Sequence, residues 1–271
     1  MRLSIVVSTH AAQFQAAPLK GDFAAGVAKV AIWGYDGVEP AIRDPSLVDA
    51  EELEGLVSSQ GLVVPAIGTG QAWGEEGLSF TSDDPAVRAA AIQRVRTHVP
   101  LAARLDAMII LGLIRGITPE GQSHERSMSF LIEAIRECAA LAAETGVRFA
   151  LEPLNRYETD LIHTVAEGLD LIDQVGTENF GLLLDTFHMN IEEPKIETSI
   201  RSCGDRIFHF HVADSNRWYP GAGHLDFGSI LETLAATGYE GFVSGEFMPL
   251  PDADTAAERG VAHLRQLVAT A

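Results

Sequence analysis

Basic residues are scarce in this chain of 271 residues. Lysine and arginine together number 19 against 38 aspartates and glutamates, which gives a net charge of −19, and only three of the basic residues are lysines. No cluster of lysine and arginine stands out, so the chain would repel a phosphate backbone and nucleic acid is not an expected partner. The acidity is instead typical of a solvated surface.

Cysteines and long apolar runs are also scarce. Cys138 and Cys203 are the only cysteines, and two scattered thiols are typical of the reducing cytoplasm rather than of a disulfide framework. No apolar run approaches the roughly 20 residues of a membrane span. The N-terminal stretch MRLSIVVSTH is too short for a signal peptide. We therefore expect a cytoplasmic protein that does not enter a membrane.

Short apolar runs alternate with longer segments of helical periodicity along the whole chain. The apolar runs, rich in valine, isoleucine and leucine, are expected strands at 2–7, 37–40, 62–67, 106–111, 147–152, 180–185, 206–211 and 242–246. The helical patterns lie near 22–33, 47–60, 85–104, 123–145, 165–175, 195–203, 228–238 and 254–268. Eight strands that are each followed by a helix predict an α/β fold, the (β/α)8 barrel.

The expected strands are almost wholly apolar, which is typical of parallel strands covered on both faces. An open doubly wound sheet is the alternative, but the first strand–helix connection, STHAAQFQAAPLKG, lacks the glycine fingerprint of a dinucleotide site. No linker or low-complexity run interrupts the pattern, and one barrel commonly has about this length. We predict a single domain over 1–271, with its active site at the C-terminal ends of the strands.

Four potential metal ligands stand at the ends of four successive expected strands. They are Glu152, Asp185, His211 and Glu246, spaced by 33, 26 and 35 residues, or about one strand–helix unit each. Strand ends converge on one face of a barrel, so these side chains should meet there. Each has a simpler alternative role, such as helix capping for Asp185. Together, however, buried carboxylates need a common partner, and three carboxylates with one imidazole suit a divalent cation such as Mn²⁺ or Mg²⁺.

A cation held in this way can polarise a carbonyl and an adjacent hydroxyl of a bound sugar. The proton on the carbon next to the carbonyl then becomes acidic, and its removal gives a cis-enediolate. Glu152 and Glu246 come from the fifth and eighth strands and could face opposite sides of that carbon. If one removes the proton and the other returns it, the configuration is inverted, which is epimerisation.

Three further polar residues lie in loops beside these ligands. His188 follows Asp185 by three residues, and Arg217 comes just after the seventh strand. Both could stabilise the negative charge of the enediolate. Glu158, in the loop after the fifth strand, could bind a terminal hydroxyl. Helix capping for His188 and solvent-exposed positions for Arg217 and Glu158 are the alternatives. Glu39, at the end of the second strand, could shape the floor of the pocket.

The runs EPLNRYETD, LDTFHMNIEE, HFHVADSNRWYPGAGHLDF and SGEFM resemble the xylose isomerase-like TIM-barrel superfamily. Within it they are similar to the D-tagatose/D-psicose (allulose) 3-epimerase group and to related keto-sugar-acid epimerases of the 5-keto-gluconate type. The resemblance is dense over 147–250 and thinner before it. The segments after Glu152 and His211 differ from the tagatose/psicose pattern, so both ketoses and sugar acids are candidate substrates.

This resemblance implies a role for each of the residues singled out above. Glu152, Asp185, His211 and Glu246 would bind one divalent ion, Mn²⁺ in the first place, with Co²⁺ or Mg²⁺ as alternatives. Glu152 and Glu246 would be the acid/base pair, and the substrate-binding residues would be Glu158, His188 and Arg217. The partner would be a small sugar or sugar acid, and the chain would form a homo-oligomer, a dimer or tetramer.

The expected enzyme is a metal-dependent carbohydrate epimerase, an isomerase that inverts C3 of a ketose or keto-sugar acid. An aldose–ketose isomerase of the hydroxypyruvate isomerase type, or a keto-inositol dehydratase, would use the same groups. The DNA-repair enzyme endonuclease IV shares the fold and the Asp185-x-x-His188 spacing, but the third and fourth strands end in IGT and LGL, without its histidines. A sugar-binding barrel without activity would not need both Glu152 and Glu246.

Overall fold

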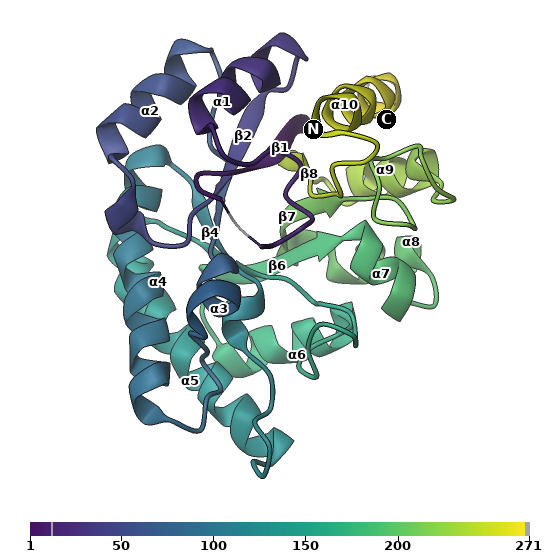
Figure 1. Ribbon diagram of the computed structural model, residues 1–271. Helices are drawn as coiled ribbons and strands as arrows, with labels where there is room; N and C mark the ends of the chain where they lie inside the picture. Colours follow the sequence, from purple (N-terminus) through teal and green to yellow (C-terminus); the bar gives the residue numbers. More distant parts are fainter. Residues whose placement is uncertain (12, 269–271) are drawn as a thin grey trace.

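The computed structural model describes residues 1–11 and 13–268, and within them eight parallel strands close into a barrel (Figure 1). The strands are β1 Arg2–Ser8, β2 Gly37–Ala41, β3 Ala66–Gly68, β4 Met108–Leu111, β5 Phe149–Leu151, β6 Phe180–Asp185, β7 Ile207–Val212 and β8 Phe242–Gly245. Each strand pairs with the next in the chain, and β8 pairs with β1. The predicted barrel is therefore confirmed.

Helices surround the barrel on its outer face (Figure 1). Those that match predicted segments are α1 Phe23–Ile32, α2 Ala50–Ser59, α4 Pro85–Leu105, α5 His124–Ala142, α6 Val165–Val175, α8 Ile196–Cys203, α9 Phe227–Ala236 and α10 Ala253–Val268. Two short helices that the pattern does not predict, α3 Gln71–Glu76 and α7 Thr186–Glu192, lie in the connections after β3 and β6. Single turns of 3-10 helix are η1 Pro45–Leu47, η2 Leu113–Arg115, η3 Ala143–Thr145 and η4 Gly204–Arg206.

Local sequence signals explain where many elements begin. Seven of the eight long helices are preceded by a side chain that accepts a hydrogen bond from a free N–H of the first turn. These residues are Asp22, Asp49, Asp84, Ser123, Thr164, Asp226 and Asp252. The third strand is shorter than the predicted run 62–67. Pro65 has no N–H to give to a ladder, so the strand begins after it, at Ala66.

The inner face of the barrel is divided into an apolar and a polar half. A small apolar cluster from β3, β4, β5 and β6 fills one half with Ala66, Met108, Ile110, Ala150 and Leu183. The other half, formed by β1, β2, β7 and β8, carries the buried polar side chains Ser4, Glu39, His209, His211 and Ser244. Polar groups are thus available inside the barrel, close to the strand ends where the candidate site lies.

One irregularity in the sheet helps to place two histidines in the polar half. The register between β6 and β7 shifts by one residue after Leu182, which pairs with Ile207, so that Phe208 is extra and Leu183 pairs with His209. His211 then pairs with Asp185.

Among residues 1–11 and 13–268, no helix is long and apolar enough to cross a membrane.

Candidate active site

The four predicted ligands meet at the C-terminal end of the barrel. Glu152 directly follows the last residue of β5, and Glu246 directly follows that of β8. Asp185 ends β6, and His211 lies near the end of β7. One ligand atom from each lies within 4.8 Å of the others. His211 Nδ1 is 3.9 Å from Glu152 Oε1, 4.0 Å from Asp185 Oδ2 and 3.9 Å from Glu246 Oε2. The structure brings together the residues that the spacing selects.

Three of these side chains each present a buried polar atom that has no hydrogen-bond partner in the part of the chain that the structure describes. The atoms are Glu152 Oε1, Asp185 Oδ2 and His211 Nδ1, which face one another. Separations near 4 Å are too long for hydrogen bonds, but they suit ligands arranged around one ion with bonds of about 2.1 Å. Three carboxylates and one imidazole therefore fit a divalent cation of the Mn²⁺ or Mg²⁺ kind.

The two carboxylate oxygens of Asp185 have different roles. Its Oδ1 accepts a hydrogen bond of 2.7 Å from the backbone N–H of Phe187 and so caps α7, which was the simpler alternative for this residue. Its Oδ2 remains without a hydrogen-bond partner and points to the site. The cap fixes the carboxylate and leaves one oxygen for an ion.

Crowding of buried carboxylates changes their proton affinity. Burial and the neighbouring charge of Glu246 raise the pKa of Glu152. Burial also raises the pKa of Glu246 to about 7, although the positive charges of His211 and Arg217 oppose this. Burial raises the pKa of Asp185 as well. Carboxylates with a raised pKa suit proton exchange near neutral pH.

Asn155 sets the tautomer of His188, a role that the sequence did not reveal. Its Nδ2 donates to His188 Nδ1 at 2.7 Å, and its Oδ1 accepts from the N–H of Tyr157 at 3.0 Å, which fixes the amide orientation. Burial, with the charges of Arg217 and Arg115, lowers the pKa of His188 well below its usual value. The neutral ring therefore carries its proton on Nε2, which lies 3.7 Å from Glu152 Oε1. This N–H can donate to a bound substrate.

Arg217 is held rigidly on another side of the site. Its Nη1 donates to Glu158 Oε1 at 2.7 Å, and its Nη2 lies 3.7 Å from Glu246 Oε2. The guanidinium lies over the ring of Phe187, 4.7 Å from its centroid, and 5.7 Å from the centroid of Phe14. Asn155 Nδ2 also donates to Glu158, at 3.0 Å, so Glu158 is held from two sides.

The backbone of Arg217 adopts φ 61°, in the left-handed region that residues other than glycine rarely occupy. Its N–H donates to the carbonyl of Asp214, and its own carbonyl accepts from the N–H of Met248, each at 2.8 Å. A strained conformation persists where surrounding bonds enforce it, and such positions cluster at functional sites.

A pocket opens over these groups, with an empty volume of about 570 Å³ that is partly open to solvent. Three of the four ligands, Glu152, His211 and Glu246, line it together with Glu158, His188 and Arg217. The remaining wall is made mainly of apolar and small residues, among them Val6, Phe14, Ala41, Ile110, Leu113 and Gly112.

Arg115, for which the sequence suggests no role, is completely buried behind this pocket. Its guanidinium donates to the carbonyl oxygens of Gly112 at 3.0 Å and Leu111 at 3.1 Å, and also to that of Glu152. It therefore joins the ends of β4 and β5 and supports the backbone of a proposed acid/base residue.

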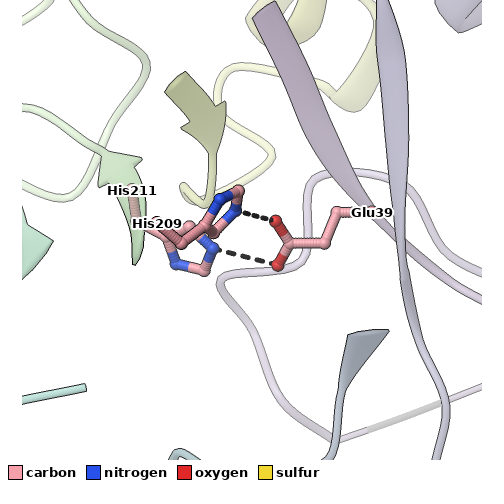
Figure 2. A group of neighbouring side chains, drawn as sticks. All are labelled: Glu39, His209 and His211. Atoms are coloured by element: carbon pink, nitrogen blue, oxygen red, sulfur yellow. Dashed lines mark hydrogen bonds and ion pairs between the residues drawn. The ribbon is translucent and has the colours of Figure 1, made fainter. Parts of the chain in front are cut away.

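Glu39 and His209 complete the polar interior (Figure 2). The Glu39 carboxylate is hydrogen-bonded to the Nε2 atoms of both His209 and His211, which explains why two histidines alternate along β7. Burial would raise the pKa of Glu39, but the charges and hydrogen bonds of His211 and His209 hold it well below its usual range.

A closed β/α barrel with four convergent ligands at its strand ends defines the class of protein, a barrel enzyme with a candidate metal centre. The sequence model of the xylose isomerase-like TIM barrel family matches residues 27–267, so the chain belongs to that family.

Known relatives refine this assignment. The chain is 34% identical over 238 residues to L-ribulose 3-epimerase of Methylomonas sp. strain DH-1, covering 83% of this chain and 80% of the relative. It is 35% identical over 235 residues to D-psicose 3-epimerase of Ruminiclostridium cellulolyticum, covering 83% and 78%. The crystal structure of D-allulose 3-epimerase from Methylomonas sp. in complex with D-allulose matches with a TM-score of 0.83 at 29% identity, over 98% of this chain and 97% of that one. The predicted family and isomerase class are confirmed.

Proposed function

We propose that this enzyme inverts C3 of a ketose or keto-sugar acid, with Glu152 and Glu246 as its two acid/base groups and one divalent ion as cofactor. One observation carries this proposal. Glu152 and Glu246 reach His211 Nδ1 from different strands, each with an oxygen at 3.9 Å, and burial raises the pKa of both. Two carboxylates of raised pKa that can take up protons near neutral pH suit proton removal and return on two faces of one carbon.

Glu152, Asp185, His211 and Glu246 would hold the ion, with Mn²⁺ the first candidate and Co²⁺ or Mg²⁺ the alternatives. When bound, such an ion would polarise the substrate carbonyl and the adjacent hydroxyl as a Lewis acid.

Each of the two glutamates would then carry out one of the two proton transfers. One glutamate removes the C3 proton and leaves a cis-enediolate, and the other gives a proton to the opposite face. The Nε2–H of His188 and the guanidinium of Arg217 provide donors for the developing negative oxygen. Glu158, which Arg217 and Asn155 hold in place, would accept a hydrogen bond from a substrate hydroxyl.

The pocket favours a ketose over a sugar acid. Arg217 is the one arginine or lysine among the described residues that line it, and Glu158 already pairs with its guanidinium. A substrate carboxylate would therefore lack a free cation and would meet several carboxylates. The relatives named as L-ribulose and D-psicose 3-epimerases support the same choice.

A panel of ketoses and keto-acids, each incubated with the Mn²⁺-loaded enzyme, tests the proposal through the stereochemistry of the products. We expect C3 epimers from at least one ketose, loss of turnover after chelation, and recovery on addition of Mn²⁺. An aldose as the only product would indicate aldose–ketose isomerisation, and a dehydrated product would indicate a dehydratase; either would overturn the proposal.

By family resemblance we also propose that the chain acts in the cytoplasm as a homo-oligomer, a dimer or tetramer. Its molar mass in sedimentation equilibrium tests the oligomeric state, and a mass equal to that of one chain would contradict it.

A further inference from the structure

One buried carboxylate is shared by two histidines of the same strand, directly beside the candidate metal site (Figure 2). Glu39, on β2, lies 2.7 Å from His209 Nε2 through Oε2 and 2.9 Å from His211 Nε2 through Oε1. All three side chains are at most 2% exposed. We call these three residues the Glu39 triad. It spans the barrel interior, because β1 and β8 lie between β2 and β7.

Small residues on the intervening strands leave room for this contact. Ser4 on β1 pairs in register with Ser244 on β8, and Ser244 pairs with His211 on β7. Both serines are completely buried. Paired residues of parallel strands point to the same face, so both serines point into the barrel with His211, while Val6 is the β1 residue that pairs with Glu39.

The hydrogen bonds determine which nitrogen of His211 is available to an ion. An ionised carboxylate only accepts hydrogen bonds, so each Nε2 that faces Glu39 carries a proton. A histidine must be neutral to bind an ion, and the lone pair of His211 is then on Nδ1. That atom is buried, has no hydrogen-bond partner among the described residues, and faces Glu152, Asp185 and Glu246 at 3.9–4.0 Å.

His209 contacts the candidate site through its hydrogen bond to Glu39 and through its ring, which packs against that of His211. Its Nε2 bonds to Glu39, its Nδ1 has no hydrogen-bond partner among the described residues, and its ring packs edge-on against that of His211 with centroids 5.2 Å apart. It supplies a donor to the second oxygen of Glu39, which would otherwise be a buried acceptor without a partner. The separations of 2.7 and 2.9 Å are ordinary hydrogen-bond lengths, so the triad is not itself a second ion site.

We propose that Glu39 is a positioning residue that fixes His211 with Nε2 protonated and Nδ1 free as the ligand atom, and that His209 holds Glu39 in place. This inference rests on the metal site of the proposed function. Second partners of this kind are known to orient metal-bound histidines and to strengthen their ligation.

Calorimetric titration of the metal-free protein with Mn²⁺ tests the role of Glu39. Glu39→Gln should raise the dissociation constant by about 10- to 100-fold, because a neutral amide is a weaker acceptor and can offer its N–H to one of the rings. Glu193→Gln is a matched control. Glu193 accepts bonds of 2.7 Å from the N–H of Val165 and 2.6 Å from Ser199 Oγ and contributes nothing to the pocket, so its loss should lower the unfolding temperature and leave Mn²⁺ affinity unchanged.

Two substitutions of His209 separate positioning from packing. His209→Phe keeps a ring but removes the donor, and it should weaken Mn²⁺ binding in the same direction as Glu39→Gln, though less. His209→Gln can place an amide N–H near the original Nε2 and should recover much of the affinity. Equal Mn²⁺ affinity in the wild type and in both His209 variants would contradict the role of His209.

NMR spectroscopy of the wild-type protein tests the protonation of both histidines without depending on the folding of a variant. In ¹⁵N-histidine-labelled protein loaded with diamagnetic Zn²⁺, long-range ¹H–¹⁵N spectra should show a proton on Nε2 of both His209 and His211. A proton on Nδ1 of His211 would overturn the inference. If the wild type binds no Mn²⁺, the proposed metal site fails; if it binds Mn²⁺ and Glu39→Gln binds it equally well, only the positioning role fails.

Discussion

Glu152 and Glu246 occupy equivalent places, each one residue beyond the end of its strand. Both lie among other carboxylates, Glu152 buried and Glu246 partly buried, and desolvation is the largest cause of the raised pKa in each. Equivalent environments are what two groups need if they are to exchange the roles of acid and base when the reaction runs in reverse. A single catalytic base would not require this similarity.

Replacing either glutamate with glutamine should therefore stop epimerisation. Glu152→Gln and Glu246→Gln each lose one proton carrier but keep an oxygen ligand, so we expect turnover to fall by roughly 10²–10⁴-fold while Mn²⁺ and substrate binding remain measurable. Each variant should still exchange the C3 proton of one epimer with solvent, and the two variants should act on opposite epimers. Full turnover in either variant would exclude the two-base mechanism.

The tautomer of His188 depends on Asn155, so the amide should contribute to catalysis without touching the substrate. Asn155→Leu removes the side-chain donor to His188 Nδ1 and to Glu158 and leaves His188 Nδ1 only the backbone N–H of residue 155, at 3.3 Å. We expect kcat/KM to fall roughly 10-fold, the size of one net hydrogen bond. Asn179→Leu is the control, because Asn179 donates to the carbonyls of Ala139 and Val147, away from the pocket. An equal fall in kcat/KM in both variants would indicate a general structural effect.

At the scale of elements, periodicity predicts the long segments and misses the short ones. The eight strands and the eight long helices follow from apolar runs and helical patterns, whereas the seven residues of α7 are too few to show a period. The four ligands could be predicted because barrel topology brings strand ends together. A place at the pocket could also be predicted for Glu39. The contacts of Asn155 with His188, of Arg115 with Glu152 and of Glu39 with His211 could not, because these partners lie 33 to 172 residues apart and side-chain packing brings them together.

Arg115 should contribute mainly to the stability of the joined ends of β4 and β5. Arg115→Met removes the guanidinium donors to the carbonyls of Gly112, Leu111 and Glu152, of which the first two keep a backbone N–H donor. We expect the free energy of unfolding to fall by about 2–4 kcal/mol. Urea denaturation of the metal-free protein measures this. Arg104→Met removes an exposed ion pair with Glu54 and should cost less than about 1 kcal/mol. If the two variants are equally stable, Arg115 does not have the role inferred from its contacts.

At the scale of the whole molecule, the barrel interior concentrates negative charge that an ion would neutralise. In the metal-free protein the pKa of Glu246 rises from its ordinary 4.5 to about 7. Its contribution to stability is therefore present below pH 4.5 and is lost as the pH rises through 7. A bound cation should reverse this trend, because it favours the ionised carboxylate.

The stabilisation by Mn²⁺ should consequently depend on pH. We expect the rise in unfolding temperature on adding Mn²⁺ to be small near pH 5, where the ion must displace a proton from Glu246, and larger near pH 8, where that proton is absent. Thermal unfolding with and without Mn²⁺ across this range measures the difference. A rise in unfolding temperature that does not change with pH would show that the ion does not bind these carboxylates.

The proposed epimerisation requires that a proton leaves C3 of the sugar and that another proton is added from the opposite face. The most direct measurement is turnover of an accepted ketose by the Mn²⁺-loaded enzyme in D₂O, followed by NMR at C3 of the product. The account predicts one deuterium at C3 of the inverted product from the first turnovers. An inverted product that retains protium at C3 would contradict it.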